Sequence, residues 1–291
     1  MISGFSSATF ATGLRTASQA RVTMDTMARQ IATGQRVSSV RDDGAAWARA
    51  NFARGEAAAS EALSSSLGVV RVGLAAAIAV GEARKDVLVD LRGTALSATD
   101  PSLGTATRSE LQARFTSLRQ AYLAELTYNA AAAGTVDLRN STGGAWAPFS
   151  AAAGAADLTW TQATDGTTTT QALTAMVGPS ADISTSASAT TTLGNIQTVE
   201  NQVLQRVAAL SGIDGRVGAD QARLTAASNR LSALAARLTD ADLGRASAAR
   251  AQAETRQQLA LSTVRQAIST YGNFASGLLG NVQRTQRGVL A

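Results

Sequence analysis

The chain contains no cysteine and no histidine among its 291 residues. This excludes disulfide bonds, thiolate and imidazole metal sites, and catalytic triads or dyads built on Cys or His. Proline occurs three times, at Pro101, Pro148 and Pro179, and outside every long apolar repeat, which favours long uninterrupted helices. Only 4% of the residues are aromatic. Alanine dominates the apolar content, and it favours slim helices over a thick core because it buries little area.

Targeting and membrane segments are also missing. The region from Met1 to Gln19 lacks the charged stretch and apolar core of a secretory signal peptide. The most apolar stretch, Leu67 to Val80, is interrupted by Arg71, so we find no uninterrupted apolar run of about 18 residues that predicts a membrane span. We therefore expect a protein that is either cytoplasmic or exported by a route without a cleaved signal.

Basic residues outnumber acidic ones, with a net charge of +5. Acidic residues accompany the basic ones, however, as in Glu82 to Asp90, whereas a nucleic-acid site favours basic residues on one face with aromatics between them. The polar face of residues 243–290 is rich in Gln and Ser rather than Lys, which argues against a helix that lies on a membrane. The composition therefore favours neither partner.

Apolar residues at both ends of the chain follow alternating steps of three and four, the a/d pattern of coiled coils. The positions of these terminal seams are Leu14, Met24, Met27 and Ile31 near the N-terminus, and Leu261, Val264, Ile268, Tyr271, Leu278 and Val282 near the C-terminus. The seams either pack within one monomer, as in a helical bundle, or remain poorly ordered until copies of the chain stack.

The pattern predicts helices over residues 5–33, 42–99, 105–129, about 193–240 and onward from about 243, with a looser pattern at 212–218. Gly34 is a candidate C-cap, and the second helix, roughly 85 Å long, stops before Pro101. Asp42 and Asp43, like Asp240 and Asp242, are interpreted as helix caps rather than as catalytic carboxylates. A central seam on the long helices is predicted to pack internally: Leu67, Val70, Leu74, Leu88, Leu91, Leu224, Leu231 and Leu234.

The predicted fold class is mainly α: an elongated, coiled-coil-like helical rod of paired N- and C-terminal helices with a small β-hairpin and loop insert. The insert is expected at residues 135–190, where Gly, Thr and Asp cluster between short apolar segments. The expected segments are 1–38, 39–134, 135–190, 191–240 and 241–291.

Four passages resemble the bacterial flagellins, of a compact kind with little or no outer domain. They are Arg29–Arg36, Val40–Ala46, Leu88–Asp100 and Leu238–Leu243, in family order and at family distances. The resemblance covers residues 1 to about 130 and 190–291. It implies that 1–38 and 241–291 pair in an inner tube of the filament, that 39–134 and 191–240 form an outer tube, and that 135–190 is exposed to the medium.

The resemblance implies a structural, non-enzymatic subunit without cofactors that polymerises into the extracellular flagellar filament and serves motility. The implied partners are many copies of itself, the flagellar export apparatus, an export chaperone, and the filament cap and junction proteins, with no nucleic acid and no membrane insertion. Two alternatives remain open: a hook–filament junction protein of the same export system, and a type III secreted effector.

The sequence departs from the family pattern in two places. The C-terminal Leu279–Ala291 is longer and more polar than the usual Leu-rich ending. Arg92 matches the central arginine by which the vertebrate innate receptor recognises typical flagellins, but Gly93 and Thr94 replace its acidic and Leu neighbours. The resemblance thus implies degenerate receptor-recognition positions at Arg92, Gly93 and Thr94.

Overall fold

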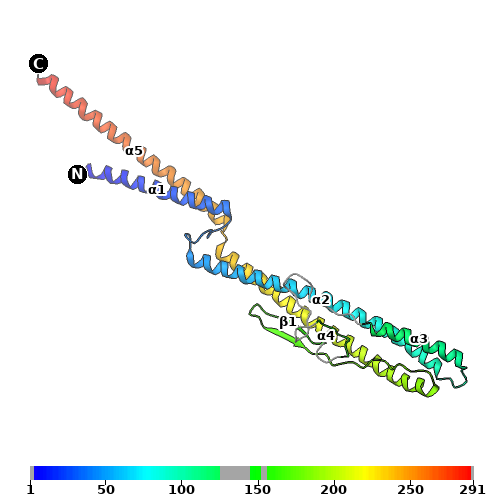
Figure 1. The fold of residues 1–291 in the computed structure, drawn as a ribbon. Coiled ribbons are helices and arrows are strands. Elements are labelled where there is room, and N and C mark those ends of the chain that lie inside the picture. Colours follow the sequence, from blue (N-terminus) through cyan, green and yellow to red (C-terminus); the bar gives the residue numbers. More distant parts are fainter. Residues whose placement is uncertain (1–2, 125–144, 152–155, 290–291) are drawn as a thin grey trace. The chain divides into compact units, whose positions relative to one another are not determined.

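The fold consists of five helices and one two-stranded sheet in the part of the chain that the structure, a computed structural model, describes (residues 3–124, 145–151 and 156–289). The mainly α class with a small hairpin is confirmed. The elements, in chain order (Figure 1), are α1 Ser3–Thr33, α2 Gly44–Ala98, α3 Thr105–Leu123, β1 Leu158–Thr161, β2 Thr168–Gln171, α4 Ser186–Thr239 and α5 Leu243–Val289.

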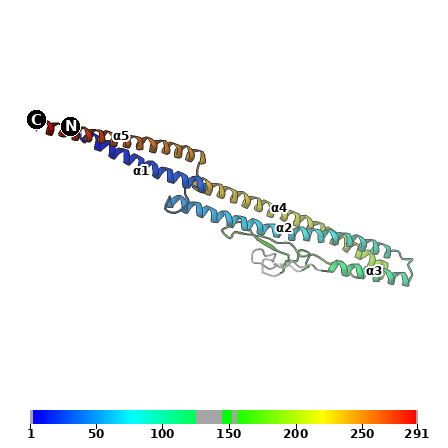
Figure 2. The same cartoon turned by 90° about the horizontal axis from the view of Figure 1, so that it is seen from above.

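The chain forms two compact units. Unit 1 contains Met1–Phe52 and Ala233–Ala291, and unit 2 contains Ala53–Ser232. In unit 1, α1 and α5 lie side by side in both views (Figures 1 and 2). Unit 2 contains α3, the sheet, and most of α2 and α4, which also lie side by side.

The helix boundaries differ from expectation in two places. Helix α3 ends at Leu123 rather than at 129, and residues 125–129 lie outside the described part of the chain. Helix α4 begins at Ser186, seven residues before the expected start at Leu193, and continues without interruption through 212–218. The early start has a local cause: the Ser188 amide donates to the Thr185 hydroxyl and the Thr185 amide donates to the Ser188 hydroxyl, each over 3.0 Å. This reciprocal cap satisfies amides at the helix N-terminus.

The turns after α1 and α4 are bonded to each other within unit 1. Gly34 has φ of 68° and ends α1, as expected of a C-cap. Its carbonyl accepts from the Ala241 amide (2.9 Å), and the Thr239 carbonyl accepts from the amides of Arg36 (2.7 Å) and Val37 (3.1 Å). These bonds join the two chain segments that enter the α1–α5 pair.

The acidic residues around these turns are caps. The Asp43 carboxylate accepts from the Ala46 amide, and the Asp242 carboxylate accepts from the Arg245 amide, each over 2.9 Å, at the starts of α2 and α5. Asp42 instead closes the preceding turn, where one carboxylate oxygen accepts from the amide and hydroxyl groups of Ser38 and Ser39 at 2.9–3.1 Å. These bonds hold the pKa of Asp42 below its ordinary value, with the Ser38 hydroxyl as the largest cause.

The core of unit 2 lies between α2, α3, α4 and the chain that connects α3 to α4. Leu67, Leu74, Leu88 and Leu91 of α2 are at most 2% exposed, and Leu210 of α4 is fully buried. Polar ties cross between the antiparallel α2 and α4: Ser64 to Thr225 (3.0 Å), Gln221 to the Ser64 carbonyl (3.3 Å), Arg71 to Asp214 (3.0 and 3.2 Å) and Arg92 to Glu200 (3.1 Å). Their spacing fixes the register of the two helices.

One stretch of α2 is, by length and composition, apolar enough to cross a membrane. Because Arg71 interrupts its apolar residues, the sequence pattern did not predict a membrane span there. This is the only such stretch among the described residues. Within unit 2, Leu67, Val70, Leu74 and Ala77 of α2 are buried, and Arg71 pairs with Asp214. The stretch is therefore accounted for as a core helix of unit 2.

The described part of the expected insert, residues 145–151 and 156–190, is partly buried. Strands β1 and β2 pair antiparallel, with Leu158 opposite Gln171. Trp146, Phe149 and Trp160 are at most 8% exposed and belong to the core of unit 2. The Trp160 indole donates to the buried Asp220 of α4 over 3.1 Å. These large apolar groups bury more area on the helices than they would as an exposed loop.

The Phe149 ring packs against α2 at Gly81. A Cβ added at Gly81 would lie 2.6 Å from Phe149 Cζ and 2.5 Å from Val207 Cγ2. Next to this contact, the Arg84 guanidinium lies 5.1 Å from the Phe149 ring and 5.3 Å from the Tyr122 ring, and donates to the Ala124 carbonyl over 2.9 Å. Gly81 thus permits the close approach of the insert to α2.

We predict opposite effects of two glycine substitutions in α2. Gly81→Ala should destabilise unit 2, because overpacking costs about 1–3 kcal/mol and outweighs a gain of up to about 1 kcal/mol in helix propensity. Gly93→Ala should stabilise it by about 0.4–1 kcal/mol, since nothing lies within 4 Å of a Cβ at Gly93. Thermal unfolding measures both, at roughly 2–4 °C per kcal/mol; equal shifts would contradict the close packing at Gly81.

We predict that the turn held by Asp42 weakens in acid. Because the folded-state pKa of Asp42 is lowered, its contribution to stability is present above the ordinary carboxyl pKa and is lost as the pH falls through the folded-state value. Asp42→Asn should therefore lower the melting temperature at pH 6. Between pH 6 and pH 2, the melting temperature of this variant should fall by less than that of the unchanged chain. Asp25→Asn, at an exposed position of α1, is the control. Parallel pH profiles for Asp42→Asn and the unchanged chain would contradict the prediction.

Candidate functional site

Small residues form the interface between α1 and α5. The buried positions of the pair are Gly13 and Ala20 of α1 and Ala246, Ala253, Ala260 and Val264 of α5. A Cβ at Gly13 would lie 2.7 Å from Val264 Cγ2 and 3.4 Å from the Ala260 carbonyl oxygen. The two backbones thus approach more closely than larger side chains would permit.

Most of the described C-terminal seam lies outside the face of α5 that packs on α1. Val264 is 7% exposed, but Leu261, Ile268 and Tyr271 are 37%, 57% and 45% exposed. The packed face contains Ala260, one position before Leu261, because only small residues fit against Gly13. Leu278 and Val282 lie where the structure describes the helix but not the side chains.

The N-terminal seam is divided between the interface and the surface. Met24, Met27 and Ile31 are half-buried. Leu14 is 45% exposed, since the adjacent Gly13 occupies the contact with α5. The pattern of large apolar residues did not predict the small-residue interface. A signal for it is present, because residues 246, 253 and 260 are all alanine, and a seven-residue spacing is typical of coiled coils.

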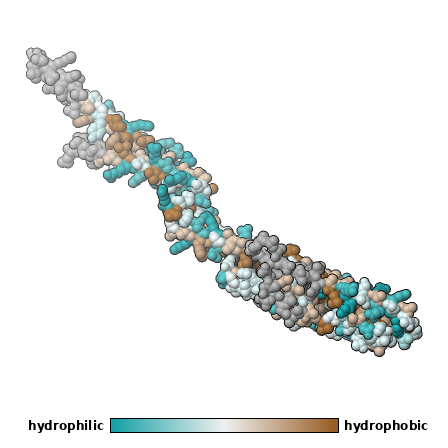
Figure 3. Space-filling view, in the orientation of Figure 1, coloured by the Kyte–Doolittle hydropathy of each residue, from teal (hydrophilic) through white to brown (hydrophobic). Residues whose placement is uncertain are grey.

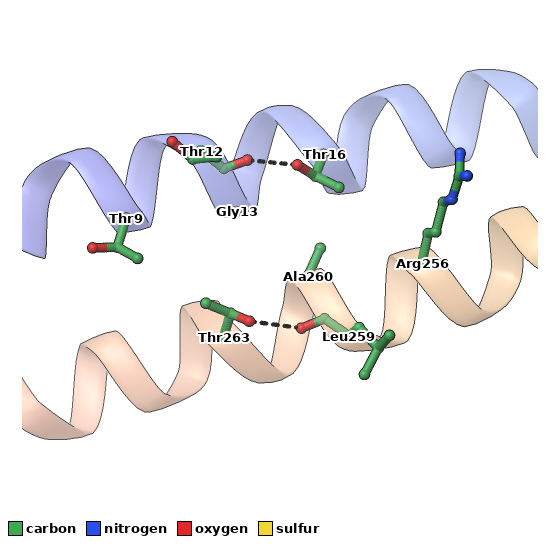
Figure 4. Close-up of a pocket in the computed structure, with 8 residues that line it drawn as sticks. All are labelled: Thr9, Thr12, Gly13, Thr16, Arg256, Leu259, Ala260 and Thr263. Carbon is green, nitrogen blue, oxygen red and sulfur yellow. Dashed lines mark hydrogen bonds between the residues drawn. The ribbon is translucent and has the colours of Figure 1, made fainter.

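A groove of about 330 Å³ lies between α1 and α5 (Figure 4). The hydroxyls of Thr12, Thr16 and Thr263 donate to the carbonyls of Ala8, Thr12 and Leu259 in their own helices, over 2.8–3.0 Å. These hydroxyls therefore need no external partner. The remaining lining residues are Thr9, Gly13, Arg256, Leu259 and Ala260, so the groove suits an apolar partner better than a polar ligand.

Large apolar side chains remain exposed on the same two helices. Leu259 and Phe274 of α5 and Val22 of α1 are each 63% exposed, in addition to the exposed seam residues. Figure 3 shows apolar patches among hydrophilic residues on the face in view. Several exposed large apolar residues on a pair of helices indicate an interaction surface, because a non-associating protein gains by burying them.

Three further carboxylates in the described part of the chain close local turns. Asp100, Asp165 and Asp182 have pKa values held below the ordinary range by hydrogen bonds from Ser102, Thr167 and Ser184, respectively. Each donor lies two residues from its acceptor, as in an Asx turn. No group of three or more Asp or Glu side chains among the described residues is placed to hold a metal ion.

The central seam of the long helices lies in unit 2 except at its C-terminal end. Leu67, Val70, Leu74, Leu88, Leu91 and Leu224 are buried, and Leu231 is half-buried. Leu234 is 47% exposed, which corrects its expected role in packing. The buried face of α4 continues from Leu231 in steps of four residues to Ala235 (2% exposed) and Thr239 (1% exposed). Leu234 does not lie on this face.

The three receptor-recognition positions differ in accessibility. Arg92 is bonded to Glu200 across the two helices, and Gly93 has no neighbour within 4 Å of a Cβ. Thr94 is only 5% exposed, and its hydroxyl donates to the Asp90 carbonyl over 2.8 Å. Arg92 and the bare backbone at Gly93 are therefore the accessible features at this point of α2.

Comparisons with known proteins agree with this arrangement of helices. The family model of the bacterial flagellin N-terminal helical region matches residues 7–132. Flagellin FljO of Caulobacter vibrioides is 30% identical over 265 residues, which cover 88% of this chain and 89% of FljO. Flagellins FljK and FljM of the same organism are 28% and 29% identical, over 88% and 86% of this chain and 89% and 88% of their own lengths. The chain belongs to the flagellin family and is a structural subunit of the flagellar filament.

Proposed function

We propose that the α1–α5 pair is the polymerisation module of this flagellin. The single observation that carries the proposal is the division of residues on the pair: small residues pack within the subunit, and Leu14, Leu261, Ile268, Tyr271 and Phe274 remain exposed. The exposed residues, with Leu278 and Val282 further along α5, contact neighbouring copies. In this arrangement, residues 1–38 and 241–291 form the inner tube of the filament.

We assign residues 39–134 and 191–240, which include most of the helical residues of unit 2, to the outer tube, with the described part of 135–190 packed on them. Each apolar contact is weak, since burial of a half-exposed Leu or Ile contributes on the order of 1 kcal/mol. Stiffness comes from repetition, because the contacts join different surfaces of successive copies in an assembly that does not close.

Assembly takes place outside the cell in this proposal. The chain passes through the flagellar export apparatus with an export chaperone, without a cleaved signal, and meets the junction proteins at the base of the filament and the cap proteins at its tip. The surface of the α1–α5 pair supports this order, because its exposed apolar residues require protection until other copies are present.

We predict that Ile268→Asp abolishes filaments and leaves the monomer folded. Ile268 is 57% exposed in the subunit, so the carboxylate stays hydrated until a neighbour buries it, at a cost of a few kcal/mol per contact. Circular dichroism reports the helix content, and electron microscopy with sedimentation reports the polymer.

Ala260→Asp is the matched variant on the same helix. Ala260 is 6% exposed and faces Gly13, so its aspartate should reduce both the pairing of α1 with α5 and polymerisation. Filaments of normal length from Ile268→Asp subunits would show that this face of α5 does not contact other copies.

We also predict weak activation of the vertebrate innate receptor for flagellin. Gly93 offers no side chain and Thr94 is buried, so two central contacts are lost, at a cost of a few kcal/mol. This corresponds to about a hundredfold loss of affinity or more. A cell reporter assay with monomeric protein measures it, with a typical flagellin as the reference; equal potency would contradict the role assigned to Gly93 and Thr94.

A further inference from the structure

Residues 172–183, which we call the strap, connect β2 to the start of α4 and form neither helix nor strand (Figure 1). Their buried side chains recur at steps of three, three and four: Leu173, Met176, Pro179 and Ile183. A step of three is typical of the polyproline II conformation, which has no internal hydrogen bonds and leaves its backbone groups available to partners. The strap is thus packed as an extended peptide.

Side chains of α3 and α4 accept hydrogen bonds from three main-chain amides of the strap. The Val177 amide donates to Gln202 Oε1 over 2.9 Å, and the Ser180 amide donates to Asn195 Oδ1 over 2.7 Å. At its end, the Ile183 amide donates to an oxygen of α3, Gln112 Oε1, over 2.8 Å. The three donors lie three residues apart, in phase with the buried side chains.

Side chains of the same two helices donate to the carbonyls of the strap. From α3, Gln112 Nε2 donates to the Ala181 carbonyl over 2.8 Å, and Arg119 Nε donates to the Pro179 carbonyl over 2.9 Å. From α4, Thr192 and the buried Arg206 donate to the carbonyls of Asp182 and Thr174, respectively. Gln112 therefore binds both a donor and an acceptor of the strap main chain.

These contacts resemble those of a bound peptide ligand more than those of a surface loop. The main-chain bonds supply affinity for any extended segment, and the pockets for the apolar side chains supply selectivity. Pro179 fits this pattern, because its main chain contributes only the carbonyl that Arg119 binds. Leu173, Met176 and Ile183 of the strap belong to the core of unit 2, and Arg119 binds the Pro179 carbonyl.

We propose that the side chains of α3 and α4 that bind the strap form a peptide-binding site, and that the strap of a second copy of this chain can replace the resident strap. The second copy supplies an identical main chain and the same apolar side chains at the same spacing. The resident strap is favoured in an isolated subunit because its tether gives it a high effective concentration. A weakened resident strap, or many copies held close together, shifts the balance toward exchange.

The test uses the full chain with Val177→Pro and Ser180→Pro, which remove two bound amides of the strap and leave Gln202 and Asn195 in place. Proline suits an extended backbone. The probe is a synthetic peptide of residues 171–185, with a fluorescent label for anisotropy. A second peptide carries the same two prolines.

We expect the unchanged peptide to bind the double variant and raise its melting temperature by several degrees in a saturable manner. The proline peptide should bind at least tenfold more weakly, because it has no amide protons to donate to the side-chain oxygens of Gln202 and Asn195. Ala175→Pro, at an exposed strap position whose amide makes none of these contacts, is the matched control and should leave the resident strap bound.

A second variant covers the case in which the double variant does not fold. Val177→Pro alone removes one bond at an exposed residue and should still admit the peptide, while Gln202→Ala added to it should weaken peptide binding. If neither variant binds the peptide, or if the proline peptide binds as well as the unchanged one, the proposal is overturned. The measurements use monomeric protein, so they are independent of the polymerisation proposed above.

Discussion

The close approach of α1 and α5 is the constraint on which unit 1 depends. At Gly13 the helices are so near that a methyl group would collide with Val264, so no side chain fits at this position. Most of the other buried positions of the pair are alanines such as Ala253 and Ala260, and several large apolar residues of the two helices lie outside this contact. An interface of small side chains buries little apolar area, and so stabilises the pair only modestly. The same geometry that limits the stability of the pair leaves Ile268 and Phe274 available to other molecules.

Unit 2 depends on the register of α2 and α4 as well as on the close approach at Gly81. Buried leucines fill the space between α2 and α4, but apolar packing is non-directional and tolerates changes of partner. The ties of Arg71 to Asp214 and Arg92 to Glu200 are exposed and contribute little free energy. Their value lies in specificity, since a helix displaced by one turn loses both. The strap also packs on the helices of unit 2, and hydrogen bonds to its main chain fix its position. These bonds do not depend on the identity of its exposed residues.

Local signals in the sequence predicted the features that depend on local chemistry. Gly34 and Asp43 were predicted as caps because a single residue type satisfies each backbone requirement. The start of α4 at Ser186 was missed because its cap uses Ser188 in place of the usual Glu or Gln, and because the threonines that follow have low helix propensity. The face of α5 that packs on α1 was missed because the heptad pattern of the large residues outweighed the alanines at 246, 253 and 260. The burial of Phe149 depends on Gly81, 68 positions earlier in the chain, and no local pattern reveals such a pair.

The two units meet the needs of a polymerising subunit in different ways. In unit 2, the aromatic residues of the described insert and Leu173, Met176 and Ile183 of the strap are buried, and side chains of α3 and α4 bind the strap main chain. Unit 2 therefore gains most of its stability within one chain. In unit 1, Tyr271 and Phe274 are still exposed after α1 and α5 have paired, so part of the available apolar free energy remains unused in the isolated subunit. That remainder is available for association with other copies of the chain.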